Sequence, residues 1–358
     1  MSIGILPNGN INQVIDYSVS LQNIPNQWGL YNALGIFQDE LMSQPKIGIP
    51  IWDGTLSVAV DKNWDERNPT LKRDTRRVLN VDIPHFPADG SIVPNDVRGI
   101  ISFADWTKGD AINLETVQRL RGEKQARAKL TLDTTLEVAR AQLIRDGSVY
   151  APSGTLKQSY GNTINFYNEF GITQTTQSTP LAASAVDPST YWETLISTIQ
   201  DSVLTGSGIG DIVVVCSPSY FTALITNDFY VDNAKQNQVI GSARLEKRLT
   251  ANGFNLDARY RSIEINGITF IEYRGTSPTG TAYIPAGEAR AFPLGVVDMF
   301  KTYYAPASRF ETNNKVAQKY YAWEWVEMGK DQEITFQNES NFLNAVLRPQ
   351  AIIRLTLT

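Results

Sequence analysis

The chain has 358 residues, and its 42% hydrophobic content supplies about 150 apolar side chains, enough for one large core or two ordinary ones. Disorder is therefore excluded as the main state. The charges nearly balance, with 32 Lys and Arg against 37 Asp and Glu and a net charge of -5. Because dedicated nucleic-acid-binding domains are normally strongly basic, this balance argues against that class while permitting local phosphate contacts.

Cysteine and histidine are too scarce for two common kinds of site. A single cysteine, Cys216, cannot form an intramolecular disulfide, and with only His85 beside it no Cys/His zinc site can be assembled. The N-terminal residues lack the basic start and apolar run of a secretory signal, and the longest apolar uncharged stretch, residues 212–226, is shorter than the ~20 residues of a membrane helix. We expect a soluble protein made in a reducing cytoplasm, with no membrane partner.

The first 45 residues mix Asn, Gln and Pro with scattered apolar residues and show no core pattern of their own. Within them, residues 29–41 have the periodicity of a short helix. A segment without its own core needs a surface to lie on. Residues 1–45 are therefore predicted to form an arm that lies across a neighbouring chain.

Residues 46–103 change to the alternation of apolar and polar residues that is typical of strands. Turn signals stand at Asp53-Gly54 and at Asp89-Gly90. This pattern predicts strands joined in a long hairpin.

The far part of this hairpin, residues 61–77, places ten charged residues in 17 positions, with Leu71 as the single aliphatic residue. Such a tip cannot form a core, so it is either solvated or in contact with another chain. The residues predicted to make an intersubunit contact are Asp61, Lys62, Trp64, Asp65, Glu66, Arg67, Lys72, Arg73, Asp74, Arg76 and Arg77.

Residues 113–146 have the pattern of the longest helix in the chain, and Gly147 follows as a helix stop. At 1.5 Å per residue such a helix spans ~50 Å, which suits a scaffold element that crosses a flat domain or spans a subunit. Its apolar positions recur at helical spacing and are Leu132, Leu136, Ala139 and Leu143.

Beyond residue 147 the chain alternates short elements, which predicts an α+β fold without internal repeats. The polar stretch 173–179 is predicted to cross between domains. Strands are predicted at 148–152, 163–167, 212–216, 263–273, 321–328, 332–336 and 351–357, and helices at 191–204 and 219–225.

Two features resemble motifs that carry chemistry. Gly206, Gly208 and Gly210 are spaced like a dinucleotide loop, but they precede the strand at 212–216 instead of following one, so we interpret them as a helix-to-strand connection. His85 is preceded by a proline and has no partner at catalytic spacing. For His85, packing or a hydrogen bond at a hairpin edge is the better interpretation.

Other chemically active side chains are also better explained by structure than by catalysis. Cys216 follows three valines and is predicted to be a buried small apolar residue, because a nucleophile would need the distant His85 as its base. The acidic group Asp61, Asp65 and Glu66 is interleaved with basic residues, which favours ion pairs over a metal or paired-carboxylate site. The sequence predicts no catalytic residue, no cofactor and no metal ion.

Several stretches resemble the lambda-type major capsid proteins of tailed bacteriophages (the E family), and the similarity covers residues 47–357. One such motif alone is unspecific, whereas many in the same order are specific. The matching stretches are VDIPHFP at 81–87, IVPNDVRG at 92–99, AQLIRDGSVY at 141–150, NEFGI at 168–172, SPSYFTALIT at 217–226, GITFIEYRG at 267–275, APA at 305–307, ETN at 311–313, ESNFL at 339–343 and RP at 348–349.

The resemblance implies the Hong-Kong-97-type capsid fold. Its parts would be an N-terminal arm at 1–45, an E-loop hairpin at 46–107, the spine helix and first part of the P domain at 108–185, the A domain at 186–300, and strands returning to the P domain at 301–358. The implied function is self-assembly into pentamers and hexamers of an icosahedral virion shell around packaged double-stranded DNA, without enzymatic activity.

The resemblance also implies partners: further copies of the chain, a portal protein, a separate scaffolding protein and, as in some shells of this type, a decoration protein. A separate scaffold is expected because the sequence shows no long N-terminal helical extension of the built-in kind. Contact with DNA is expected to be non-specific, since phosphate binding grows with each Lys or Arg engaged. Assembly is expected in the cytoplasm of the host bacterium.

Two other functions stay open from the sequence alone. The first is a related compartment shell of the same fold that encloses a cargo, as encapsulins do. The second is an α+β hydrolase-type enzyme that uses the region of Ser217-Pro218 together with His85.

Overall fold

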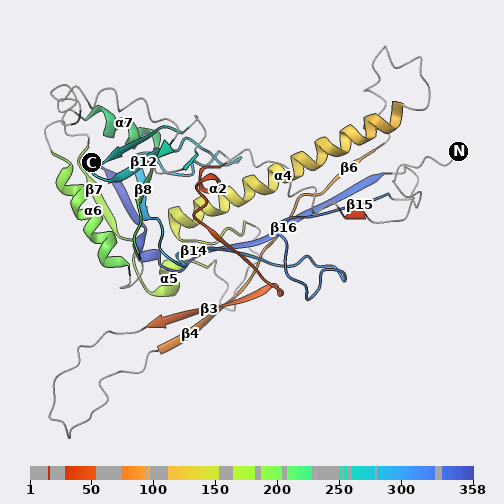
Figure 1. The fold of residues 1–358 in the computed structure, drawn as a ribbon, viewed down its shortest axis with the longest axis horizontal. Helices are drawn as coiled ribbons and strands as arrows, with labels where there is room; N and C mark the ends of the chain where they lie inside the picture. The colour runs from red at the N-terminus through yellow and green to blue at the C-terminus, as the bar shows by residue number, and fades with distance from the viewer. Residues whose placement is uncertain are drawn as a thin grey trace, which may run out of the picture.

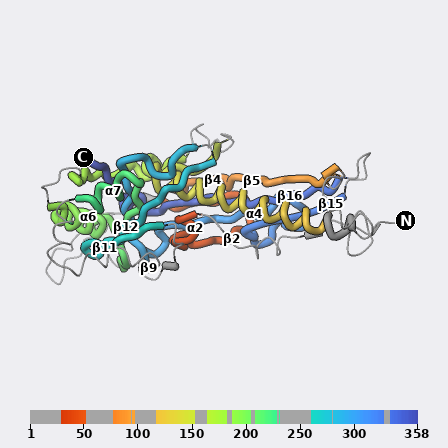
Figure 2. Tube along the Cα trace, turned by 90° about the horizontal axis from the view of Figure 1, so that it is seen from above, coloured from red at the N-terminus to blue at the C-terminus, as the bar shows by residue number. Residues whose placement is uncertain are grey.

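A long helix and two β-sheets make up a flat, elongated molecule, seen from its broad face in Figure 1 and edge-on in Figure 2. The computed structural model describes residues 15–16, 29–53, 75–93, 95–96, 112–152, 164–181, 187–203, 208–227, 230, 250–251, 254–255, 260–278, 280–326 and 333–358.

The helix α4 (Ile112–Asp146) confirms the long helix predicted at 113–146. It ends at Gly147, which has a φ of 69°. An added Cβ at this position would overlap the ring of Tyr167, so only glycine fits. The predicted apolar positions are all buried: Leu132, Leu136, Ala139 and Leu143.

A seven-stranded sheet, counted within the described residues, lies along α4 in the order β1-β15-β16-β14-β2, with β5 and β6 also paired to β16. The strand predicted at 321–328 is confirmed as β15. The strands are β1 (Ile15–Asp16), β2 (Gln38–Leu41), β5 (His85–Pro87), β6 (Gly90–Ile92), β14 (Phe300–Tyr304), β15 (Tyr321–Val326) and β16 (Ile334–Val346).

The central strand β16 is much longer than the strand predicted at 332–336. A run of polar residues from Asn338 to Asn341 hides it in the hydropathy pattern, yet these residues are buried. Ser340 Oγ donates to Lys319 O at 2.7 Å, and Asn341 Nδ2 donates to Glu339 Oε1 at 3.1 Å. The strand continues because the sheet satisfies these polar groups.

The chain does not reverse at Asp89-Gly90, so the turn predicted there is wrong. Pro87 and Gly90 keep the same register against β16, which makes β5 and β6 one extended segment with a short break. The side chain of Asp89 bridges the break, because its Oδ1 accepts from Asn338 N at 3.2 Å.

A six-stranded sheet forms the other end of the described molecule, in the order β11-β12-β8-β13-β17-β7. Helices α6 (Ser189–Ser202) and α7 (Pro218–Thr226) pack on it in one apolar cluster and confirm the two predicted helices. The strands are β7 (Thr176–Thr179), β8 (Ile212–Cys216), β11 (Ser262–Ile265), β12 (Ile268–Glu272), β13 (Glu288–Pro293) and β17 (Ile353–Leu357).

The stretch 173–179, predicted to cross between domains, contains the edge strand β7, which pairs in parallel with β17. β17 follows the short 3-10 helix η2 (Pro349–Ala351) and also pairs with β13, so the C-terminal residues share a sheet with β8. The short strands β9 (Thr250–Ala251) and β10 (Phe254–Asn255) pair with each other. The division of the chain into domains by residue range stays a prediction.

Strands β3 (Lys46–Asp53) and β4 (Thr75–Asp82) form an antiparallel hairpin that leaves the body of the molecule, as Figure 1 shows. The strands predicted from residue 46 onward are thereby confirmed at the base of the hairpin, while residues 54–74 lie outside the described residues. The inward face of the base is buried and consists of Ile47, Ile49, Ile51, Leu79 and Val81.

Two predicted elements have a different form. The helix expected at 29–41 is only α2 (Leu30–Leu34), because Gly35, with a φ of 61°, ends it and the chain then extends as β2. The strand expected at 163–167 is instead an isolated bridge between Ser148 and Asn165 followed by helix α5 (Phe166–Phe170). Asn165 caps this helix, and its Oδ1 accepts from Tyr167 N at 2.9 Å.

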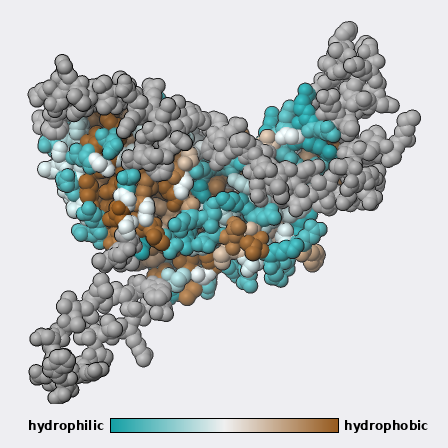
Figure 3. Space-filling view, viewed as in Figure 1, coloured by the Kyte–Doolittle hydropathy of each residue, from teal (hydrophilic) through white to brown (hydrophobic). Residues whose placement is uncertain are grey.

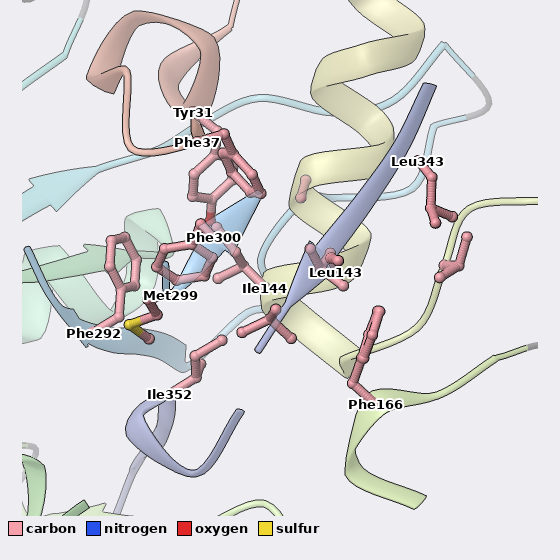
Figure 4. Packing of buried hydrophobic residues seen from close by; sticks show 14 of the residues in the cluster. Tyr31, Phe37, Leu143, Ile144, Phe166, Phe292, Met299, Phe300, Leu343 and Ile352 are labelled. Carbon is pink, nitrogen blue, oxygen red and sulfur yellow. The ribbon is translucent and has the colours of Figure 1, made fainter. Parts of the chain in front are cut away.

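One apolar core joins these parts (Figure 4). Tyr31 and Phe37, from the segment around α2, meet Phe300 of the seven-stranded sheet and Phe292 of the six-stranded sheet. Ile144 of α4 packs into the same cluster. The helix, both sheets and the segment that precedes the hairpin therefore form a single packed unit.

Candidate functional site: surfaces for assembly

Helix α4 carries a buried carboxylate, Glu137, that joins three parts of the chain. Its Oε1 accepts from Tyr31 N at 2.9 Å and from Tyr273 Oη at 2.7 Å, and its Oε2 accepts from Asn32 N at 2.9 Å. Burial raises the pKa of Glu137, and the three donors oppose that rise. This carboxylate holds α4, α2 and the residue that follows β12 together.

Arg140, on the same helix, ties α4 to the seven-stranded sheet. Its guanidinium donates to Asn32 Oδ1 at 2.8 Å and to Thr302 Oγ1 at 3.1 Å, and it lies 3.7 Å from the carboxylate of Asp39. The guanidinium also lies over the ring of Phe37, 4.6 Å from its centroid. The planar fork of arginine suits this arrangement because it presents several donors at fixed angles.

Other charged side chains of α4 also face the sheet. Arg121 forms an ion pair with Glu324 on β15, and both side chains are largely buried. Lys129 Nζ lies 3.2 Å from Asp133 Oδ2, and Asp133 accepts a further hydrogen bond from Tyr320 Oη. Removing one partner of a buried pair leaves an uncompensated charge, so the pair of Arg121 with Glu324 fixes the helix on the sheet.

The hairpin base has an outer face that points away from the core, made of exposed residues in alternate positions. Val78 is 58% exposed and lies against Gly48, where an added Cβ would be 2.9 Å from Val78 Cγ1. Exposed Pro50 is the cross-strand partner of Val78. The exposed ion pair of Lys46 with Asp82, 3.4 Å apart, flanks this small apolar patch.

Among the residues predicted to contact another chain, Arg77 has a described side chain, and it binds within its own chain. Its guanidinium lies 3.7 Å from the carboxylate of Glu169 on α5 and also donates to Glu169 O. Arg77 thus fixes the hairpin base to the body. Arg76 lies in β4, where only its backbone is described, and the residues outside the described part are Asp61, Lys62, Trp64, Asp65, Glu66, Arg67, Lys72, Arg73 and Asp74.

A second exposed feature is the segment between β14 and β15. Phe310 is fully exposed there, and Val316 is 65% exposed. The neighbouring Arg309 is held in place by the indole of Trp323, 4.1 Å from its centroid. Thr312 Oγ1 donates to Ala307 O at 2.7 Å, so an internally bonded turn presents the aromatic ring to solvent.

The isolated chemical candidates have structural roles. His85 Nδ1 lies 2.7 Å from Asn341 Oδ1, which confirms a hydrogen bond, but the bond forms between β5 and β16 of the seven-stranded sheet and not at a hairpin edge. Cys216 is fully buried, as predicted, and burial raises the pKa of its thiol well above the ordinary value. Ser217 caps α7 by accepting from Tyr220 N at 3.4 Å, and it follows β8 of the six-stranded sheet, whereas His85 lies in β5 of the seven-stranded sheet. The structure therefore does not bring together the residues of the enzyme alternative.

Sequence analysis missed the anchoring residues Glu137 and Arg140. Charges on a long helix resemble a solvated face, and only the fold shows that these two are buried. The one available signal was their spacing of three residues, which places both on one side of α4. Phe310 was missed because a lone aromatic residue in a polar segment carries no pattern.

The described residues contain neither a metal-binding cluster nor a membrane-spanning helix. No group of three or more His, Cys, Asp or Glu side chains in that part of the chain is arranged to hold a metal ion. No described helix is both long enough and apolar enough to cross a membrane.

Figure 3 shows that polar residues cover much of the middle of the broad face, while apolar residues gather toward the end that holds α6. The surface of the molecule thus has three exposed features: a flat polar body, the outer face of the hairpin around Val78, and the turn that exposes Phe310. These are features for binding other macromolecules over a broad area.

Comparison with known proteins identifies the relatives of this chain. The model of the family described as phage major capsid protein E matches residues 18–357. The major capsid protein of Pseudomonas phage KPP10 is 32% identical over 341 residues, which cover 92% of this chain and 93% of that protein. The major capsid protein of Salmonella phage Felix O1 is 24% identical over 367 residues, 94% of each chain.

The fold is also found among solved structures. A putative capsid protein of a prophage of E. coli CFT073 superposes with a TM-score of 0.59 at 10% identity, covering 97% of this chain and 100% of that one. This likeness concerns the fold alone. The neighbours include phage capsids of the Hong-Kong-97-type fold, which confirms the predicted fold class.

Proposed function

This chain belongs to the phage major capsid protein E family, and from that premise we propose how its geometry serves in a virion shell. Copies of the chain build the shell of a phage head, and the expectation of pentamers and hexamers around packaged double-stranded DNA follows from this function. The rigid body supplies the wall. The hairpin β3–β4 supplies a connection to a neighbouring copy.

The observation that carries the proposal is the asymmetry of the hairpin. Its base is fixed by five buried aliphatic side chains and by the ion pair of Arg77 with Glu169, while its outer face is exposed and it extends away from the body in Figure 1. A two-stranded ribbon has too little core to be stable alone, so binding to another copy stabilises it. The charged residues 61–77 would then give the contact specificity more than affinity.

Deletion of residues 61–74, which leaves β4 and the Arg77–Glu169 pair in place, tests this role of the hairpin. We expect a folded subunit that no longer forms closed shells, because the buried base remains and the intersubunit end is lost. Particles are counted by negative-stain electron microscopy, and circular dichroism checks the fold. A matched control deletes no residues but replaces the eight charged side chains of residues 61–74 with Ser, which separates charge from length. Normal shells from the deletion variant would contradict the proposal.

The alternatives are weaker. A cargo-enclosing compartment shell is not favoured, because the family model and both curated relatives are phage capsid proteins. The family is structural, and we propose that the chain has no enzymatic activity. This second point is supported by the positions of the two residues, because His85 lies in the seven-stranded sheet and Ser217 caps α7, next to the six-stranded sheet.

The partners follow from the family as proposals. We expect a portal protein and a separate scaffolding protein to bind the shell, and we expect assembly in the host cytoplasm; a decoration protein is a partner of only some shells of this type. Packaged DNA is expected to meet the shell non-specifically, since the net charge of -5 gives little reason for tight phosphate binding. Co-purification of particles with these components from infected cells tests each one.

A further inference from the structure

The hairpin β3–β4 is held by the body along only part of its described length. On its inward face, Ile49 and Ile51 belong to the same apolar cluster as Leu143 of α4 and Phe166 of α5. Arg77 is the cross-strand partner of Ile51, and two more residue pairs of the ladder follow it toward the far end. Arg77 therefore stands where the hairpin leaves the core, and in Figure 1 the ribbon extends away from the body beyond its base.

The apolar contacts of the base do not by themselves fix the direction of the hairpin. They lie on one face only, because Pro50 and Val78 on the opposite face are exposed. Apolar contact is non-directional, so a ribbon held in this way tilts more easily than one that a directional contact also holds. A directional contact at the point of exit is needed to keep one angle.

Arg77 supplies a directional contact of this kind. Its Nη1 lies 3.7 Å from Glu169 Oε2, and its Nη2 donates to the carbonyl oxygen of the same residue. The guanidinium holds its donors at fixed angles in one plane, so two acceptors on one residue fix its orientation as well as its distance. Because both side chains are partly exposed, the contact adds little to the stability of the subunit, and its removal leaves the fold intact.

Glu169 is a firm reference point because α5 is bound to the end of α4. Phe166 N donates to Gly147 O at 2.8 Å, and Asn165 Nδ2 donates to Asp146 O at 3.0 Å. The side chain of Phe166 is fully buried in the core. The contact with Glu169 therefore fixes the hairpin relative to the long helix.

A small change of angle at the base has a large effect at the far end of the hairpin. Residues 54–74, between the two strands, number 21, so each half of this connection has about ten residues. Ten residues span at most ~35 Å, and a tilt of ~10° at the base then moves the far end by up to ~6 Å. That displacement exceeds the ~3 Å length of a hydrogen bond, so the contacts made by the far end depend on the exit angle.

We propose that the contact of Arg77 with Glu169 is a latch that sets the angle at which the hairpin reaches a neighbouring copy, and that this angle sets the curvature of the shell. The inference rests on the proposed function, because curvature arises only between copies. When identical copies are joined by a repeated contact, the angle between successive copies decides whether the assembly closes. Arg77 is thus a positioning residue, which acts on the neighbour through the direction of the hairpin.

Distance measurements in unassembled subunits test the latch without any neighbour. Spin labels are attached to cysteines introduced at Thr75, the first residue of β4, and at Thr194 on α6, while Cys216 is fully buried and stays unlabelled. Pulsed electron paramagnetic resonance gives the distribution of distances between the labels. We expect this distribution to broaden by ~3 Å in Arg77→Ala, the movement that a tilt of ~10° produces over the extended residues from Val81 to Thr75.

The matched control is Lys46→Ala. Lys46 lies 3.4 Å from Asp82 across the two strands of the same hairpin, so its loss removes an exposed ion pair that does not involve the body. This variant should keep the narrow distribution of the unsubstituted chain. Equal widths for Arg77→Ala and Lys46→Ala would overturn the latch.

A charge swap tests the latch in assembly. Arg77→Glu and Glu169→Arg each place like charges opposite each other, so each should reduce the count of shells with the wild-type diameter by ~fivefold or more, equivalent to ~1 kcal/mol. The double variant restores opposite charges and should recover part of the count, since the hydrogen bond to the carbonyl of residue 169 is not restored. Particles are counted and measured by negative-stain electron microscopy. A double variant no better than Arg77→Glu, or a normal count from either single variant, would overturn the proposal.

The proposed function and the latch fail in different ways. If the unsubstituted chain forms no particles, the proposed function fails, while the label distances still report whether Arg77 holds the hairpin. If particles form but the charge swap does not restore them, the latch fails alone.

Discussion

Replacement of Glu137 by alanine measures how strongly the buried carboxylate holds the subunit together. The change leaves three donors without an acceptor: Tyr31 N, Asn32 N and Tyr273 Oη. An unsatisfied buried donor costs ~1–3 kcal/mol, and the variant avoids the cost of desolvating a carboxylate on folding, which offsets part of that loss, so we expect the free energy of unfolding to fall by ~3–5 kcal/mol. Loss of the aliphatic stem acts in the same direction.

The measurement is urea unfolding of unassembled subunits, followed by circular dichroism. The matched control is Glu123→Ala on the same helix. Glu123 is about half exposed and lies 3.8 Å from Arg119, so its loss should change the free energy by less than ~0.5 kcal/mol. A fall of under ~1 kcal/mol for Glu137→Ala, at an unchanged denaturant slope, would refute the idea that this carboxylate is a joint.

Two further predictions concern stability. Gly147→Ala should destabilise the subunit by ~2–4 kcal/mol, because the new residue would need a positive φ and its Cβ would overlap the Tyr167 ring. The control Gly35→Ala also needs a positive φ but has open space around it, so it should cost only ~1 kcal/mol. Equal losses for the two variants in thermal unfolding would contradict this prediction. Burial raises the pKa of Glu339 above its ordinary 4.5. The protonated side chain therefore contributes to the free energy of unfolding, and this contribution is fully present below pH 4.5 and is lost as the pH rises through the raised pKa. Glu339→Gln should flatten this part of the pH profile of urea unfolding, and an unchanged profile would exclude the explanation.

Patterns that depend on burial alone were predictable from the sequence. Leu132 and Leu143 lie on the predicted stripe of α4, and the valine run of β8 is buried on all sides. In both cases the spacing of apolar residues, or an unbroken run of them, directly follows which side chains the fold buries. The order of short motifs likewise identified the family, and several of them lie on elements of one fold, such as 218–226 on α7 and 339–343 on β16.

Polar residues that the fold buries were not predictable in this way. Asn338 and Asn341 resemble loop residues in the sequence, and their partners lie far away along the chain, as His85 does for Asn341. The Asp89-Gly90 pair is a good local turn signal, but pairing with β16 overrides it. Local preference decides a segment only where tertiary pairing does not offer more hydrogen bonds.

The same distinction applies to the candidate surfaces. The contact of the charged residues 61–77 stays a prediction, made because charges in a segment without a core need solvent or a partner. The apolar character of the α4 surface around Thr134 could not be predicted, since Thr134 and its neighbours look polar until their hydroxyl groups are seen to donate within the helix. Hydrogen bonds within one helix therefore turned a polar sequence into an apolar surface.

The polar anchors of α4 have a consequence for assembly. Glu137 and Arg140 fix the segment around α2 to the helix, and Arg77 fixes the hairpin base to α5, so these parts keep one arrangement before any neighbour binds. Association then does not have to order the body, which is one of the main free-energy costs of binding. Individual exposed ion pairs contribute only ~0–1 kcal/mol, and a rigid body allows many such weak contacts to form together. A closed shell can therefore be stable while each contact remains weak enough to correct errors in assembly.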